Sequence, residues 1–143
     1  MEVDFAFLAD SAESVNGKLY VLGGGIHTIW TGQVPMVYKR PLSFVLRIML
    51  DVAEIGRTHK LEIQIMDEDG KSVTTVGGDL QIPMKNPDLP KGWRQGFTSV
   101  LNFQNLTFPK FGNYSFNIVI NNSNYKHIPL RLAQRMEIPK QTI

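Results

Sequence analysis

The chain has 143 residues, with 15 basic and 13 acidic side chains, 43% hydrophobic residues and no cysteine. The absence of cysteine excludes disulfide bonds, thiolate zinc sites, iron–sulfur clusters and a cysteine nucleophile. The length predicts one globular domain at residues 1–133, followed by an extended C-terminal tail at residues 134–143. The near balance of charge over the whole chain gives no signal for nucleic acid as a partner.

The first residues favour a cytoplasmic protein. Glu2 and Asp4 stand where a signal peptide needs basic side chains, and no apolar run approaches the roughly 20 residues that cross a bilayer. We therefore expect no membrane association.

Alternation of apolar and polar residues predicts about eight strands. In chain order they are residues 3–9, 18–30 (broken at its glycines), 42–50, 59–66, 73–82, 97–106, 114–120 and 125–132. The third, fourth and seventh of these strands alternate most clearly, as half-buried strands do. Their apolar faces supply the predicted core: Leu42, Phe44, Leu46, Ile48, Leu61, Ile63, Ile65, Tyr114, Phe116, Ile118 and Ile120.

Turn residues between these runs favour antiparallel pairing. Asn16-Gly17 and Asp69-Gly70 suit tight hairpins, and residues 121–124 tolerate left-handed backbone. No window shows the periodicity of a crossover helix, which argues against a parallel sheet. The sequence thus predicts an all-β, two-layer antiparallel β-sandwich with immunoglobulin-like or related topology.

The irregular segment 83–94 contains Pro83, Pro87 and Pro90 and is predicted to be an ordered surface loop. It also holds the candidate partner-binding residues: Trp93, Arg94, Lys91 and Lys85. A tryptophan beside an arginine in a restrained loop is typical of interface hot spots, and the lysines would steer an acidic partner. The alternative, which the sequence favours, is that Trp93 folds down and plugs one end of the sandwich.

Two conspicuous motifs have structural interpretations. Gly23-Gly24-Gly25 invites a phosphate-binding loop, but a strand-like sequence and not a helix follows it, so we interpret it as a bulge that bends one strand. Asp67-Glu68-Asp69-Gly70 lacks the ligand spacing of a calcium loop and is predicted to be a hairpin turn with solvated acids. The residues given structural roles are Gly17, Gly23, Gly24, Gly25, Gly70 and Tyr114.

Tyr114 follows Gly112 at the head of a predicted strand. Sandwich folds often place a tyrosine there, with its hydroxyl hydrogen-bonded back to the preceding connection. We predict this hydrogen bond and a mainly structural role for Tyr114.

No motif supports catalysis, and we expect no catalytic residue, metal or cofactor. His27, His59 and His127 are isolated in sequence and lack metal-ligand spacing, and no nucleophilic serine motif is present. Ser43 and Ser115 are expected on solvated polar strand faces. The dispersion of the basic residues argues against binding of nucleic acid. Two modest clusters are the exception: Lys85, Lys91 and Arg94, and Lys126, Arg131, Arg135 and Lys140.

Several segments resemble one family of small bacterial domains of unknown function. They are residues 7–13, the run Asn16-Gly17-Lys18-Leu19-Tyr20-Val21-Leu22-Gly23-Gly24-Gly25, residues 57–62, residues 67–70 and residues 111–116. The chain departs from the family at Ile26, where an aromatic residue commonly follows the glycines, and it lacks the usual Pro-Trp after the third strand. The resemblance implies an all-β fold and a bacterial or phage origin, and it transfers no catalytic residue.

Two functions are consistent with these residues. The first is a non-catalytic binding or interaction module that presents loops or an edge strand to a protein partner or to its own copy. The second is a small-ligand sequestering domain or enzyme whose site is assembled from His27, His59 and Arg94. A deep pocket lined by those three residues would favour the second function, and an exposed apolar surface the first.

Overall fold

The computed structural model describes residues 1–82, 84 and 86–136, most of which form strands. The strands are β1 (Glu2–Val15), β2 (Lys18–Gly24), β3 (Thr28–Thr31), β4 (Met36–Tyr38), β5 (Leu42–Leu50), β6 (Thr58–Asp67), β7 (Ser72–Gln81), β8 (Gln95–Phe103), β9 (Leu106–Phe108), β10 (Gly112–Ile120) and β11 (Ser123–Gln134). One short 3-10 helix, η1 (Val52–Glu54), follows β5. The all-β prediction is confirmed.

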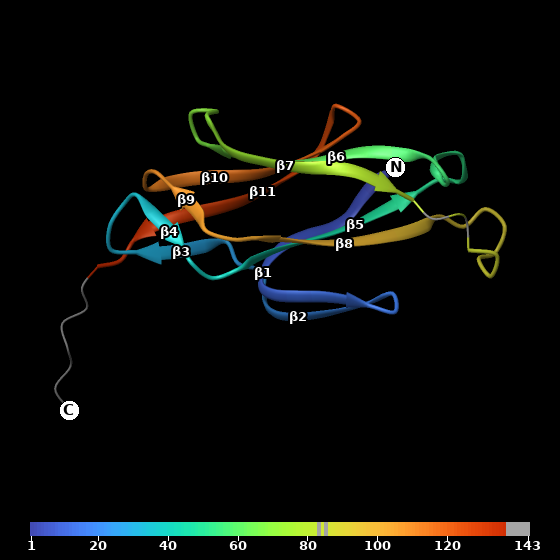
Figure 1. Ribbon diagram of the computed structural model, residues 1–143, viewed down its shortest axis with the longest axis horizontal. Coiled ribbons are helices and arrows are strands. Elements are labelled where there is room, and N and C mark those ends of the chain that lie inside the picture. Colours follow the sequence, from blue (N-terminus) through green and yellow to red (C-terminus); the bar gives the residue numbers. More distant parts are fainter. Residues whose placement is uncertain (83, 85, 137–143) are drawn as a thin grey trace.

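Two main sheets form the layers of a sandwich (Figure 1). One has the strand order β2-β1-β5-β8, the other has the order β3-β11-β10-β6-β7, and β4 pairs with β9 separately. All pairs are antiparallel except β3 with β11, where Ile29 pairs in parallel with Leu132. The expectation of purely antiparallel sheets is wrong at this pair, because β3 follows a crossing between the sheets and no hairpin turn fixes its direction. The immunoglobulin-like topology stays a prediction.

The described residues contain more strands than the eight expected. The predicted strand at residues 18–30 divides into β2 and β3, which belong to different sheets, and the one at residues 97–106 divides into β8 and β9. Asn105, with φ of 53°, separates the second pair. Of the expected tail, Gln134 belongs to β11, and residues 137–143 lie outside the described residues.

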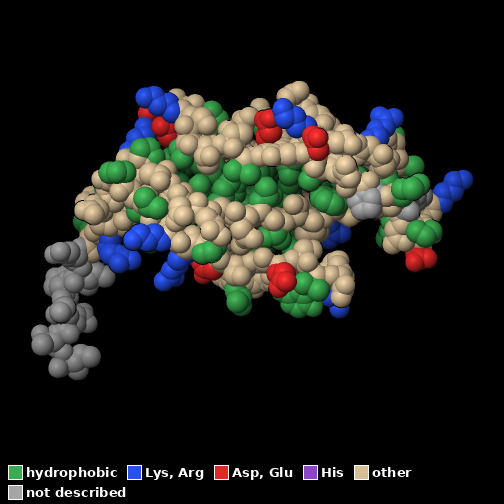
Figure 2. All heavy atoms as spheres, in the orientation of Figure 1, with side chains coloured by type: hydrophobic (Ala, Val, Ile, Leu, Met, Phe, Trp, Pro, Cys, Tyr) green, Lys and Arg blue, Asp and Glu red, His purple; other side chains and the backbone are tan. Residues whose placement is uncertain are grey.

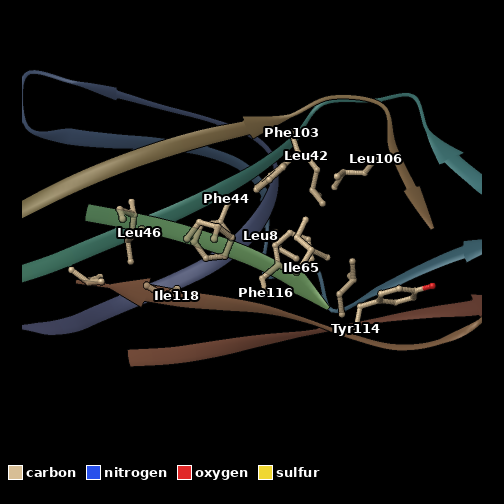
Figure 3. Packing of buried hydrophobic residues seen from close by; sticks show 14 of the residues in the cluster. Leu8, Leu42, Phe44, Leu46, Ile65, Phe103, Leu106, Tyr114, Phe116 and Ile118 are labelled. Carbon is tan, nitrogen blue, oxygen red and sulfur yellow. The ribbon is translucent and has the colours of Figure 1, made fainter. Parts of the chain in front are cut away.

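The core lies between the two sheets. All of the core residues predicted from alternation are at most 2% exposed. Phe116 of β10 is central: its ring stacks on Phe44 of β5 at 5.9 Å and meets Phe103 of β8 edge-on at 5.7 Å. Figure 3 shows these rings between strands of both layers. The core faces predicted for the three most clearly alternating strands are therefore confirmed.

The β1–β2 hairpin turns back and lies over the outer face of the first sheet, beneath β8 in Figure 1. Its two-residue turn has positive φ at Asn16 (50°) and Gly17 (74°), as a tight hairpin of this kind requires. At the base of the hairpin, Gly24 leaves little room for a side chain, since an added Cβ would lie 3.0 Å from Val21 Cγ1 and 3.4 Å from the Phe7 ring. The fold-back explains why Val45, on the outer face of β5, is fully buried.

The glycine triplet ends a strand and starts the crossing between sheets. Gly23 and Gly25 have positive φ (62° and 82°), and the Gly25 amide donates to the Leu8 carbonyl at 2.8 Å. The sequence suggested a bulge within one continuous strand, and this interpretation is wrong. The triplet releases the chain from β2 so that β3 joins the second sheet.

Two polar residues expected in solvent are buried. Ser43 is 1% exposed, because the hairpin covers its face of β5, and its hydroxyl donates to Asn102 Oδ1 at 2.7 Å. Asp67 is 9% exposed, and one of its carboxylate oxygens accepts hydrogen bonds from the backbone amides of Lys71 and Asp69, each at 2.9 Å. The bond from Lys71 is the main cause that lowers the pKa of Asp67 below its ordinary value. Asp67 thus stabilises the predicted hairpin turn through these hydrogen bonds.

The structure contains the tyrosine hydrogen bond expected from the sequence. The Tyr114 hydroxyl donates to the Lys110 carbonyl at 2.6 Å and accepts from the Lys110 amide at 3.2 Å. Its ring meets Phe108 edge-on at 5.0 Å. Burial raises the pKa of Tyr114 above its ordinary value, so the hydroxyl stays protonated and able to donate at neutral pH.

Candidate functional site

Trp93 is exposed at the end of the loop that joins β7 to β8. Its side chain is 62% exposed, so the favoured expectation of a plug is wrong. Gly92, with φ of 85°, turns the chain, and the Trp93 amide donates to the Pro90 carbonyl at 3.1 Å. The local backbone is therefore a hydrogen-bonded turn that holds the indole outward.

Arg94, the next residue, anchors the end of this loop through contacts with the first sheet. Its Nη1 lies 2.6 Å from Glu2 Oε1, its Nε lies 3.0 Å from Asp51 Oδ1, and its Nη2 donates to the Met49 carbonyl at 3.3 Å. The hydrogen bond to Glu2 is the main cause that raises the pKa of Arg94. One exposed ion pair contributes little, but three oxygens around one guanidinium fix its position.

Of the two lysines in the predicted site, the structure describes Lys91. Lys91 is exposed beside the Trp93 turn. Lys85 lies outside the described residues, as does Pro83. Figure 2 shows hydrophobic and basic side chains together at this end of the molecule.

The structure does not bring together His27, His59 and Arg94. His27 lies beside Arg131, whose amide donates to the His27 carbonyl, and Arg131 pairs with Asn113 at the start of β10. His59 lies at the other end of β10. Because a strand rises about 3.3 Å per residue, the two ends of β10 are about 23 Å apart. Both ring nitrogens of His59 are engaged, with the Glu54 carbonyl at 2.8 Å and with the Asn121 amide at 2.9 Å. A ligand site built from these three residues is therefore excluded.

A polar cleft lies between the folded-back hairpin and the outer face of β5 and β8. It has a volume of about 270 Å³. Its lining residues are Ser14, Gly17, Arg47, Gly96, Phe97 and Thr98. The Arg47 guanidinium sits over the Phe5 ring at 5.9 Å, and its Nε lies 3.5 Å from Asp4. A guanidinium beside two hydroxyl groups suits a small carboxylate or phosphate.

Sequence reasoning missed this cleft. Arg47 lies on the outer face of β5, and nothing in local alternation predicts that Ser14 of the hairpin lies over it. The glycine of β8 gave the nearest signal, because a Cβ at Gly96 would lie 3.0 Å from Arg47 Nε. Such a close approach is visible only once the strands are paired.

The described residues contain neither a cluster of metal ligands nor a membrane-spanning helix. Across residues 1–82, 84 and 86–136, no group of three or more His, Asp or Glu side chains is placed to hold a metal ion. Within the same described part, no helix is long and apolar enough to span a membrane. The cytoplasmic location stays a prediction.

The fold and these surfaces define an all-β sandwich with an anchored, aromatic loop at one end and a folded-back hairpin on one face. A family model described as "Family of unknown function (DUF6941)" matches residues 4–133, and the chain belongs to this family. No curated protein matches the chain. The family match agrees with the resemblance drawn from the sequence, and it assigns no activity.

Proposed function

We propose that this protein is a non-catalytic binding module, and that a protein partner docks on the loop at residues 86–94 with Trp93 as the central contact. The exposed fraction of Trp93 carries this proposal. A tryptophan buries a large area when it is covered by a partner, and tryptophan is enriched among the residues that dominate binding energy.

The anchoring of the loop supports the same conclusion. Arg94 is held by Glu2 and Asp51, and the turn before it is closed by the Pro90 carbonyl. A loop that is ordered before binding loses less conformational entropy when the partner arrives. Arg94 therefore acts as a positioning residue, Trp93 as the contact and Lys91 as a charge at the rim.

Affinity capture with matched tryptophan variants tests this proposal. The bait proteins are the wild type, Trp93→Ala and Trp30→Ala. The last is the control, because Trp30 on β3 is a comparably exposed tryptophan (57%). Captured proteins are compared by quantitative mass spectrometry, after circular dichroism has shown that each bait is folded. We expect a partner that the wild type and Trp30→Ala retain and Trp93→Ala loses.

The partner found in this way is then purified and its affinity measured. Removal of a hot-spot tryptophan costs about 2 kcal/mol or more, so Kd should rise about 30-fold for Trp93→Ala and stay nearly unchanged for Trp30→Ala. If no captured protein depends on Trp93, the binding surface lies elsewhere and the proposal fails.

A further inference from the structure

Strand β2 is a free sheet edge with exposed apolar side chains. Four strands end the two main sheets: β2, β8, β3 and β7. Among them, β2 alone carries two large apolar side chains that are more than half exposed, Tyr20 at 59% and Leu22 at 72%. Figure 2 shows hydrophobic side chains on the lower surface, where Figure 1 places the hairpin.

This edge lacks the features that normally protect an unpaired strand. Residues 19–22 are consecutive apolar residues, with no proline and no charge among them, and Lys18 is the only charged residue of β2. Natural proteins protect exposed edges with prolines, charges or bulges, because a bare edge pairs readily with another strand. A bare edge in a folded protein therefore points to a strand that pairs.

The hairpin turn determines which backbone groups face outward. In a two-residue hairpin the flanking residues, here Val15 and Lys18, form a hydrogen-bonded pair, and such pairs alternate along the ladder. Lys18, Tyr20 and Leu22 therefore direct their amide and carbonyl groups toward β1. Leu19 and Val21 direct theirs toward the free edge, where a second strand can bind them.

A second copy of the chain fits this edge through a two-fold axis at Val21. Val21 then pairs with Val21 of the second copy. Tyr20 of each copy lies opposite Leu22 of the other, so four apolar side chains form one cluster. Lys18 faces Gly24 of the second copy, which has no side chain, and no like charges oppose each other. A shift of the axis to Tyr20 would place Lys18 against Leu22, which is less favourable.

Charge on the exposed face also permits this pairing. Glu13 lies beside Tyr20 in the register of the hairpin, and Lys18 follows on the same face. Each hairpin thus carries one acid and one base there, so two copies approach without net repulsion on this face. Self-pairing needs no partner of other chemistry, because both edges supply matching donors and acceptors.

We propose that two copies of this protein form a symmetric dimer by antiparallel pairing of their β2 strands, joining the two four-stranded sheets into one continuous sheet. This surface is formed by the hairpin and not by the Trp93 loop, so the dimer and the proposed partner site do not depend on each other.

Sedimentation velocity over a range of concentrations tests the dimer. The wild type should sediment as a dimer that dissociates on dilution. The double variants Tyr20→Lys/Leu22→Lys and Tyr20→Glu/Leu22→Glu should each be monomeric, because like charges then face each other across the axis. Their equimolar mixture should recover a dimer, since each lysine then faces a glutamate. A control, Trp30→Lys on edge strand β3, should dimerise like the wild type.

Circular dichroism and thermal melts establish that the variants are folded, and recovery of the dimer on mixing shows this independently. A wild type that is monomeric at its highest soluble concentration would overturn the proposal. So would a dimer that persists in both charged variants, because the interface would then lie away from β2.

Discussion

Replacing Ile63 with alanine should lower the free energy of unfolding by about 2–5 kcal/mol, the range for truncating a fully buried aliphatic side chain. Ile63 is central in β6, pairs with Ile118 of β10 and Val76 of β7, and has no exposed surface. The loss combines the removed apolar contact with the cavity that remains, since strands on both sides restrict collapse. Urea denaturation followed by circular dichroism measures it.

The adjacent residue gives the matched control. Gln64 points to the other face of β6, where its amide contacts the carboxylate of Glu62 at 3.3 Å. Gln64→Ala should change the free energy of unfolding by about 0.5 kcal/mol or less. Equal losses for the two variants would contradict the register of β6 and the placement of the core.

Tyr114→Phe should lower the free energy of unfolding by about 1–3 kcal/mol, although it removes a single oxygen atom. The Tyr114 hydroxyl is the donor to the Lys110 carbonyl and the acceptor for the Lys110 amide, so its loss leaves both backbone groups without this partner. The ring contact with Phe108 is kept, which isolates the contribution of the hydroxyl. Thermal and urea unfolding measure the change.

Tyr125→Phe is the control for this oxygen atom. Tyr125 lies on β11 with its side chain 39% exposed, so removal of its hydroxyl should be close to neutral. If Tyr114→Phe is as stable as Tyr125→Phe, the hydrogen bond does not stabilise the connection between β9 and β10.

The sequence predicted the parts of the fold that depend on local alternation. Strands β5, β6 and β10 each have one apolar face, so their core residues follow from a period of two. Strand pairing across long separations is not encoded in this pattern. The parallel contact of β3 with β11 and the brief pairing of β4 with β9 were missed for that reason.

The fold-back of the β1–β2 hairpin explains why the prediction for the outer face of the first sheet was wrong. Alternation alone assigns Ser43 to solvent, and only a third layer of chain over β5 buries it. The same layer creates the cleft at Arg47. The glycines at residues 23–25 marked the point of bending, but they carried no information on its direction.

The loop before β8 was recognised from its prolines, whereas the roles of Trp93 and Arg94 were not separable in sequence. Exposure of Trp93 depends on the position of the carboxylates that form ion pairs with Arg94. These come from Glu2 at the start of β1 and Asp51 after β5, both distant in sequence. Tertiary contacts therefore decide which of the two adjacent residues is exposed and which is held in ion pairs.

Fluorescence of Trp93 in solution tests the central claim most directly, because the proposed function requires an exposed indole. The variant Trp30→Phe leaves Trp93 as the only tryptophan of the chain. The structure predicts an emission maximum close to that of tryptophan in water and efficient quenching by acrylamide. Emission at shorter wavelengths together with protection from acrylamide would show that Trp93 is buried, and would contradict the proposed binding surface.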